Sequence, residues 1–249
     1  ACALIGVFLV LKRLSLIGDG MSHVCLTGVA VALLTSSNPV YMSVPVVVLS
    51  SLGIMKITQK FKIYGDAAIG IVSAAGLSVG LLITAFAGGF NTDLLGYLFG
   101  SILTVSWDEV LLCGILLAAV LGGLRFFYRD LTSACFDEPF ARTRGVPVRI
   151  VNTALVAVTS VAVVLAFKVV GIFLISAMLI IPPVSALLVS HTFKQVLVCA
   201  ACFGVASVWL GVYLSFLFNI PSGATIILVN LLVLAGCYIY AKVGGSDAR

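Results

Sequence analysis

The sequence predicts an all-α membrane protein, and its composition is the first observation that supports this. Of the 249 residues, 62% are hydrophobic and 9% are charged, and the mean hydropathy is +1.27. Soluble domains carry about 25% charged residues, because a surface that faces water must be polar. The composition therefore excludes a soluble enzyme, a nucleic-acid-binding domain, a disordered chain and a small disulfide scaffold.

A succession of apolar runs is the second observation. A helix that crosses a bilayer needs about 20 apolar residues. We therefore expect one transmembrane domain, residues 1–249, with eight or nine membrane-spanning helices. The runs that we assign to these helices are 1–11, 16–34, 40–55, 66–88, 110–127, 150–167, 169–189, 196–218 and 224–240. The first run is short and starts within apolar sequence, so we interpret it as a truncated helix. Residues 94–104 are apolar but too short to span, and we expect a re-entrant segment there.

The distribution of basic residues predicts the orientation of these helices. If Lys12 and Arg13 are cytosolic and the sides alternate, 13 of the 14 Lys and Arg residues fall in the cytosol. The exception is Lys168. This arrangement places the C-terminus in the cytosol and requires residues 94–104 to enter and leave on one face. It also gives the outer face a negative mouth, for which the candidate residues are Asp93, Asp108 and Glu109.

Asp19 and His23 are the clearest candidates for chemistry within the membrane. They are four residues apart, so on a helix they share one face. A carboxylate and an imidazole at this spacing can hold one divalent ion such as manganese, iron or zinc. The alternative is structural, with Asp19 as a helix N-cap and His23 hydrogen-bonded inside the bundle. Two ligands make an incomplete shell, which a second copy of the chain would double to four.

The longest polar stretch runs from Arg125 to Arg149, and within it residues 130–148, approximately, form a candidate docking segment on the cytosolic side. Residues 136–147 mix charges with aromatic side chains and contain Gly145, a candidate C-cap. A short amphipathic helix here could dock into a groove on a partner protein. The alternative is a solvated loop helix.

Small residues and prolines mark two further points in the bundle. Gly76 and Gly80 form a G-x-x-x-G pattern, which serves either packing within one chain or an interface between subunits. Pro182 and Pro183 lie inside an apolar run, where we expect a broken helix that lines a cavity. The sequence contains no G-x-x-x-x-G-K-[ST] motif, so any work driven by ATP requires a partner.

Residues 13–30, which contain Asp19 and His23, resemble the signature of the zinc/manganese/iron ABC-transporter permeases, the membrane subunits of metal importers. Further stretches match the family in chain order: 93–103, 136–147, 170–183 and 220–225. The resemblance covers nearly the whole chain. It departs from the family at Gly20, where the family usually has Ala, and at Thr27, where it usually has Pro. Thr27 puts the geometry of the helix beside the site in question.

The resemblance implies a permease of an ABC importer that moves zinc, manganese or iron into the cell. The chain would not be an enzyme, since ATP hydrolysis would occur on cytosolic ABC ATPase subunits. Its other partners would be a second copy of itself and an extracellular or periplasmic metal-binding protein, and nucleic acid would not be among them. No cofactor would be permanently bound, because the metal ion is the cargo. The location would be a bacterial cell (inner) membrane.

The resemblance also assigns roles to residues. Asp19 and His23 match the positions that coordinate the ion in transit, and residues 136–147 match the helix that couples the permease to the ATPase. The residues that we assign to this coupling are Phe136, Asp137, Glu138, Phe140, Ala141, Arg142 and Gly145. Three other functions stay open. They are an ABC permease for a metal chelate such as a siderophore or cobalamin, a secondary cation carrier with Asp19 as a proton site, and a membrane-embedded enzyme or interaction protein that uses His23.

Overall fold

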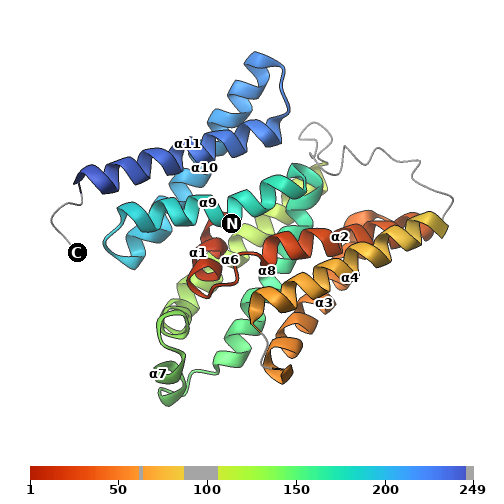
Figure 1. Cartoon of the computed structure of the whole chain (residues 1–249), viewed down its shortest axis with the longest axis horizontal. Coiled ribbons are helices and arrows are strands. Elements are labelled where there is room, and N and C mark those ends of the chain that lie inside the picture. Colours follow the sequence, from red (N-terminus) through yellow and green to blue (C-terminus); the bar gives the residue numbers. More distant parts are fainter. Residues whose placement is uncertain (62–63, 87–105, 245–249) are drawn as a thin grey trace.

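A computed structural model describes residues 1–61, 64–86 and 106–244, and every regular element in these ranges is an α-helix (Figure 1). The helices are α1 (Cys2–Leu11), α2 (Ile17–Leu34), α3 (Pro39–Phe61), α4 (Gly65–Phe86), α6 (Trp107–Phe136), α7 (Glu138–Thr143), α8 (Val148–Val170), α9 (Ile172–Val189), α10 (Phe193–Phe218) and α11 (Ser222–Gly244). The predicted re-entrant segment, 94–104, lies outside the described residues.

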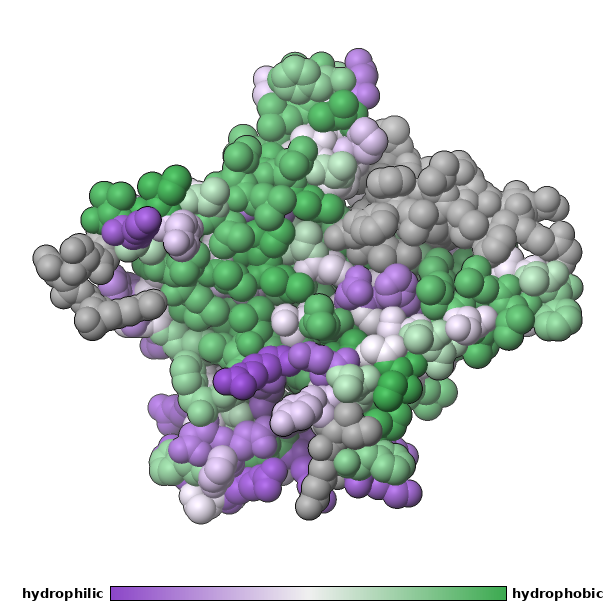
Figure 2. Space-filling model, in the orientation of Figure 1, coloured by the Kyte–Doolittle hydropathy of each residue, from purple (hydrophilic) through white to green (hydrophobic). Residues whose placement is uncertain are grey.

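The described helices confirm the predicted membrane bundle. Seven of them are long and apolar enough to cross a bilayer, namely α2, α3, α4, α6, α8, α10 and α11. Two shorter apolar helices, α1 and the segment Leu174–Val189 of α9, complete the set. Hydrophobic side chains cover most of the visible face, and hydrophilic ones gather at the end where α7 lies (Figure 2). This distribution is typical of a chain whose middle faces lipid.

Helix α2 lies at the centre of the described bundle. It packs against α3, α4, α8 and α9. Its buried share is 67%, whereas that of α6 is 6%, so α6 belongs to the periphery. Ile17 and Met21 of α2 are fully buried and join a core that includes Phe8 of α1 and Leu179 of α9. A residue on α2 is therefore held from several sides by other helices.

The small residues of α4 serve packing inside the chain. A Cβ added to Gly76 would lie 2.7 Å from a methyl group of Val24, and one added to Gly80 would lie 3.1 Å from the backbone of Thr27. Both positions therefore let α4 approach α2 closely. Of the two alternatives for this G-x-x-x-G pattern, the structure shows packing within one chain.

The expected break at Pro182 and Pro183 is wrong. α9 runs without interruption from Ile172 to Val189, and both prolines are buried inside it. Pro183 lies against Gly6 of α1, and Pro182 lies near Gly204 of α10. Packing of the proline rings against glycines on two neighbouring helices holds α9 helical here, although proline removes backbone hydrogen bonds.

Candidate functional site

Asp19 and His23 lie together in the first two turns of α2. The His23 Nε2 atom is 3.7 Å from the Asp19 Oδ2 atom, and the side chains are 32% and 51% exposed, respectively. The pair therefore forms a partly open polar position on the most buried spanning helix. Leu16 occupies the N-cap position of α2, so Asp19 is not the N-cap that the structural alternative required.

Glycines on both sides of Asp19 allow the neighbouring helices to close around it. A Cβ added to Gly18 would collide with Leu179 of α9. One added to Gly20 would lie 2.5 Å from Ile69 of α4. The Gly-Asp-Gly sequence therefore places Asp19 between α9 and α4. The same contact gives a local reason for Gly20, where the related permeases usually have Ala.

A contact that the sequence did not reveal holds the carboxylate of Asp19. The Ser176 hydroxyl on α9 donates a hydrogen bond of 3.3 Å to the Oδ1 atom of Asp19. The two residues are 157 positions apart. No local pattern predicts such a pair, because it depends on how α9 packs on α2. The bond leaves Oδ2, the oxygen that faces His23, free to take another partner.

The contact with α9 also places the pair along the bundle axis. Ser176 lies four residues after the start of α9 at Ile172 and 13 residues before its end at Val189, which corresponds to about 6 Å and about 20 Å of helix. The pair therefore lies beside α9 within its span, nearer to the Ile172 end than to the Val189 end.

The pair is incomplete as a metal shell. Within the described ranges, no group of three or more His, Cys, Asp and Glu side chains could hold a metal ion. The Nδ1 atom of His23 is buried, and no described group forms a hydrogen bond with it. Ligating imidazoles in permanent sites almost always donate their second N–H to a partner. The arrangement suits an ion that is held briefly better than one that is stored.

Thr27 ties α2 to α4 beside the site. Its hydroxyl donates a hydrogen bond to the carbonyl oxygen of Gly76. α2 continues as one helix past this position to Leu34. At this position, where the family resemblance leads us to expect Pro, Thr27 therefore forms an interhelical hydrogen bond to α4.

The predicted coupling segment contains the short helix α7. The Asp137 side chain accepts a hydrogen bond of 2.9 Å from the Phe140 N–H and caps the helix. Gly145 follows with φ +79°, a left-handed conformation that favours glycine. Ala141 is buried against Ala134 and Val148, whereas Phe140 is 52% exposed. The helix is thus anchored on one side and presents an aromatic side chain on the other.

The remaining residues of the coupling segment divide between these two sides. Phe136 is 65% exposed and Arg142 is also exposed. Glu138 turns toward the bundle, where Lys12, Asn152 and Arg142 surround its carboxylate at 3.3, 3.0 and 3.5 Å. Burial raises the pKa of Glu138, but the hydrogen bond from Asn152 and the charges of Lys12 and Arg142 outweigh it, so the pKa lies below its ordinary value.

Lys12 joins α7 to the segment that leads into the site helix. It follows α1 directly, and α2 begins five residues later. Its side chain is 6% exposed, and its ammonium group also donates a hydrogen bond of 2.8 Å to the Ala134 carbonyl. A buried ammonium with two oxygen partners is a firm contact. It links the short polar helix to the α1–α2 connection.

The predicted mouth residues have different environments. Asp93 lies outside the described residues. Asp108 is exposed in the first turn of α6. Glu109 is 8% exposed and accepts a hydrogen bond of 3.1 Å from the Ser106 N–H in a capping box at the start of α6. This carboxylate therefore stabilises a helix end.

Together, the bundle of spanning helices and the ionisable pair on its most buried spanning helix are typical of a multi-pass membrane transport protein. Residues 1–241 match the ABC 3 transport family, and the chain belongs to this family. Its relatives are membrane subunits, and the chain is accordingly a permease component that carries no P-loop of its own.

Relatives with names that refer to metal transport resemble the chain over nearly its full length. The manganese transport system membrane protein MntC of Listeria monocytogenes is 33% identical over 97% of this chain and 86% of its own length. A probable iron transport system membrane protein of Haemophilus influenzae is 32% identical over 97% of this chain and 89% of its own length.

Two solved structures share the fold. One is PsaBC from Streptococcus pneumoniae in complex with Fab, with a TM-score of 0.83 and 30% identity over 95% of this chain and 85% of that chain. The other is an inward-facing putative metal-chelate type ABC transporter, with a TM-score of 0.68 and 18% identity over 96% of this chain and 84% of that chain. The second likeness concerns the fold alone.

Proposed function

We propose that this chain is the permease subunit of an ABC importer that carries a divalent transition-metal ion into the cell. The observation that carries the proposal is the Asp19–His23 pair, which is partly open and lies on the most buried of the described spanning helices. Ionisable residues inside a membrane are rare and mark transport paths. Names given to relatives, such as manganese and iron transport proteins, support the same cargo class.

The spacing of the pair suits one ion shared between its two facing atoms. Metal–nitrogen and metal–oxygen bonds to imidazole and carboxylate are about 2.0–2.2 Å. With bonds of about 2.1 Å, the Nε2–Oδ2 distance of 3.7 Å corresponds to an N–metal–O angle of about 120°. This angle is close to the tetrahedral value and needs little movement of either side chain. Water, or the same pair from a second copy of the chain, would complete the shell.

The chemistry of the pair also favours release. The carboxylate of Asp19 offsets the hydration that the cation loses, while Ser176 keeps this carboxylate in place through its other oxygen. Two ligands from one chain bind more weakly than the closed four-ligand sites that hold structural metals. An ion in transit must leave again, so a weak, shared site serves transport.

Movement of the ion requires that conformational changes driven by ATP on the partner subunits are transmitted to the Asp19–His23 pair. We infer that cytosolic ATPase subunits bind the exposed side of α7, where Phe140 is available, together with Phe136 at the end of α6. The Lys12–Glu138 contact then transmits a movement of α7 to the α1–α2 connection, and so to Asp19. Transport results when ATP binding and hydrolysis favour one arrangement and then the other. An extracellular or periplasmic metal-binding protein would deliver the ion on the opposite side.

Uptake in reconstituted vesicles tests the proposal against its alternatives. We expect accumulation of manganese, iron or zinc only when the partner ATPase and ATP are present. Uptake that proceeds without an ATPase and follows a proton gradient would support a secondary carrier instead. Uptake of a siderophore or cobalamin complex, with no uptake of the free ion, would support a chelate permease.

A further inference from the structure

The long peripheral helix α6 changes direction where we expect it to leave the membrane. It has 30 residues, so it is about 45 Å long, whereas a bilayer core is about 30 Å thick. Phe127 has non-helical angles (φ −104°, ψ 15°) and marks a kink. The 21 residues from Trp107 to Phe127 suffice to cross the core. The rest of α6 continues beyond it toward α7.

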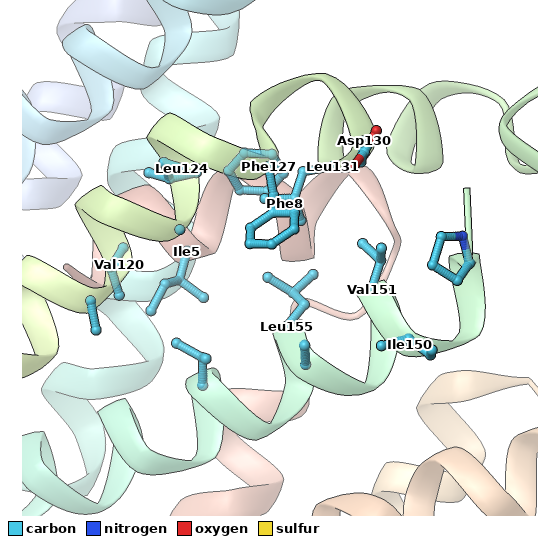
Figure 3. A pocket seen from close by; sticks show the side chains of 15 residues that line it. Ile5, Phe8, Val120, Leu124, Phe127, Asp130, Leu131, Ile150, Val151 and Leu155 are labelled. Atoms are coloured by element: carbon cyan, nitrogen blue, oxygen red, sulfur yellow. The ribbon is translucent and has the colours of Figure 1, made fainter. Parts of the chain in front are cut away.

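An apolar crevice lies on the bundle side of this kink. It has a volume of about 360 Å³ and is bounded by α1, α6 and α8. Figure 3 shows Phe8 of α1 between Phe127 of α6 and Leu155 of α8, with Asp130 near the end of the crevice. Asp130 is the one charged residue among the fifteen that line it. Ile150, on its rim, is 68% exposed, so the crevice is accessible from outside the chain.

A cationic hollow adjoins the same turn of α6. It has a volume of about 530 Å³, and Arg125, Arg129 and Lys194 line it together with Tyr128 and other side chains. No acidic residue is among its lining residues. In the part of the chain that the structure describes, none of these three basic side chains forms an ion pair or a hydrogen bond. The hollow is therefore a concentration of positive charge without a protein counter-ion.

The two cavities meet on one side chain. Leu124 lines both of them. An apolar crevice at membrane depth continues into a cationic hollow at the membrane edge, next to an aromatic residue of the kind enriched at that interface. A molecule that fits both has a negative head and a hydrocarbon tail. Basic pockets at the cytoplasmic ends of membrane helices bind anionic lipid head groups in this manner.

We propose that this place binds an anionic phospholipid, with its phosphate between Arg125, Arg129 and Lys194 and one acyl chain in the crevice. The assignment rests on the proposed orientation, in which the α7 end faces the cytosol. A free phosphate ion would leave the crevice unexplained. An acidic protein surface would fit the hollow alone, and it would not reach between α1 and α8. The bound lipid braces the kink from which α6 leads into α7.

Lipid binding to the purified permease tests the head-group half of the proposal. The probe is phosphatidylglycerol, compared with phosphatidylcholine of the same acyl chains and with inorganic phosphate. We expect phosphatidylglycerol to be retained in native mass spectra and to raise the thermal midpoint. The double variant R125Q/R129Q should bind it about thirtyfold more weakly. K56Q/K60Q, which removes two exposed charges from α3, should bind as the wild type does.

A second pair of variants, at Gly123 and Gly122, tests whether an acyl chain occupies the apolar crevice. A Cβ added to Gly123 or to Gly122 meets nothing within 4 Å, so a side chain can be introduced at both positions without a clash at its first carbon. Gly123 lines the crevice and Gly122 does not. We expect G123L to weaken phosphatidylglycerol binding about tenfold, because it fills space meant for the acyl chain, and G122L to have no such effect.

Several results would overturn the proposal. Equal stabilisation by inorganic phosphate and phosphatidylglycerol would identify a free-anion site. Unchanged lipid binding in R125Q/R129Q, or equal binding in G123L and G122L, would reject the lipid site itself. A defect seen only when the ATPase is present would identify a protein contact. These readouts measure binding, so failure of the metal-transport proposal would leave them unaffected.

Discussion

The contact between Lys12 and Glu138 allows a quantitative prediction, because the distance between its charged atoms and the exposed fractions of both side chains are known. The charged atoms are 3.3 Å apart, which gives an attraction of about 1 kcal/mol in water and about 5 kcal/mol at an effective dielectric constant of about 20. Lys12 is 6% exposed and Glu138 is 40% exposed. The net contribution lies nearer the lower figure, because desolvation of the ammonium opposes the attraction.

The variant K12M removes this attraction and also leaves the Ala134 carbonyl without its ammonium partner. We expect a loss of about 1–3 kcal/mol in the free energy of unfolding, which corresponds to a few degrees in the thermal midpoint. The control R13M removes an adjacent, exposed charge and should change the midpoint little. Because Arg13 has φ +56°, methionine and arginine meet the same backbone constraint there.

A double-mutant cycle isolates the pair itself. The double variant K12M/E138Q should lose less unfolding free energy than the sum of the losses in K12M and E138Q, with a coupling energy of about 1 kcal/mol. If the two effects simply add, Lys12 and Glu138 do not interact, and the inferred link between α7 and the α1–α2 connection is refuted. With the ATPase present, the same variants should lower metal uptake more than ATP hydrolysis.

Three further predictions concern packing and pH. G28A should lower the free energy of unfolding by about 1–3 kcal/mol, because its new methyl group collides with the Ser43 backbone. The control G53A places its methyl group in open space and should not lower it. The thermal midpoints of the two variants measure this difference. T27V should lower stability by about 0.5–1 kcal/mol in the same assay through loss of the α2–α4 hydrogen bond, and an unchanged midpoint would contradict it. Because the pKa of Glu138 is lowered in the folded state, its stabilising effect is complete above its ordinary pKa and disappears as the pH falls through the lowered one. The midpoint difference between wild type and E138Q should therefore shrink on acidification; a constant difference would contradict this.

Sequence reasoning succeeded where one helix carries the whole signal. The spanning helices follow from runs of apolar residues, and Asp19 and His23 share a face because they are four residues apart. It failed where two distant segments decide the outcome. Ser176 beside Asp19 is such a case.

The prolines of α9 illustrate the same limit. Proline removes a backbone hydrogen bond wherever it stands, and this local rule predicted a break. Pro182 and Pro183 instead pack on glycines of α10 and α1, and α9 continues through them. Only the packed structure shows which neighbours compensate for a missing bond.

Metal uptake by variants of the Asp19–His23 pair tests the central claim most directly. The permease is reconstituted with its ATPase, and initial rates of manganese, iron and zinc uptake are measured for D19N and H23Q. The matched controls are D66N, an exposed carboxylate in the first turn of α4, and H191Q, an exposed histidine between α9 and α10. We predict that D19N and H23Q each reduce uptake at least about tenfold while D66N and H191Q keep wild-type rates. Wild-type uptake in D19N and H23Q would contradict the assignment of the metal path.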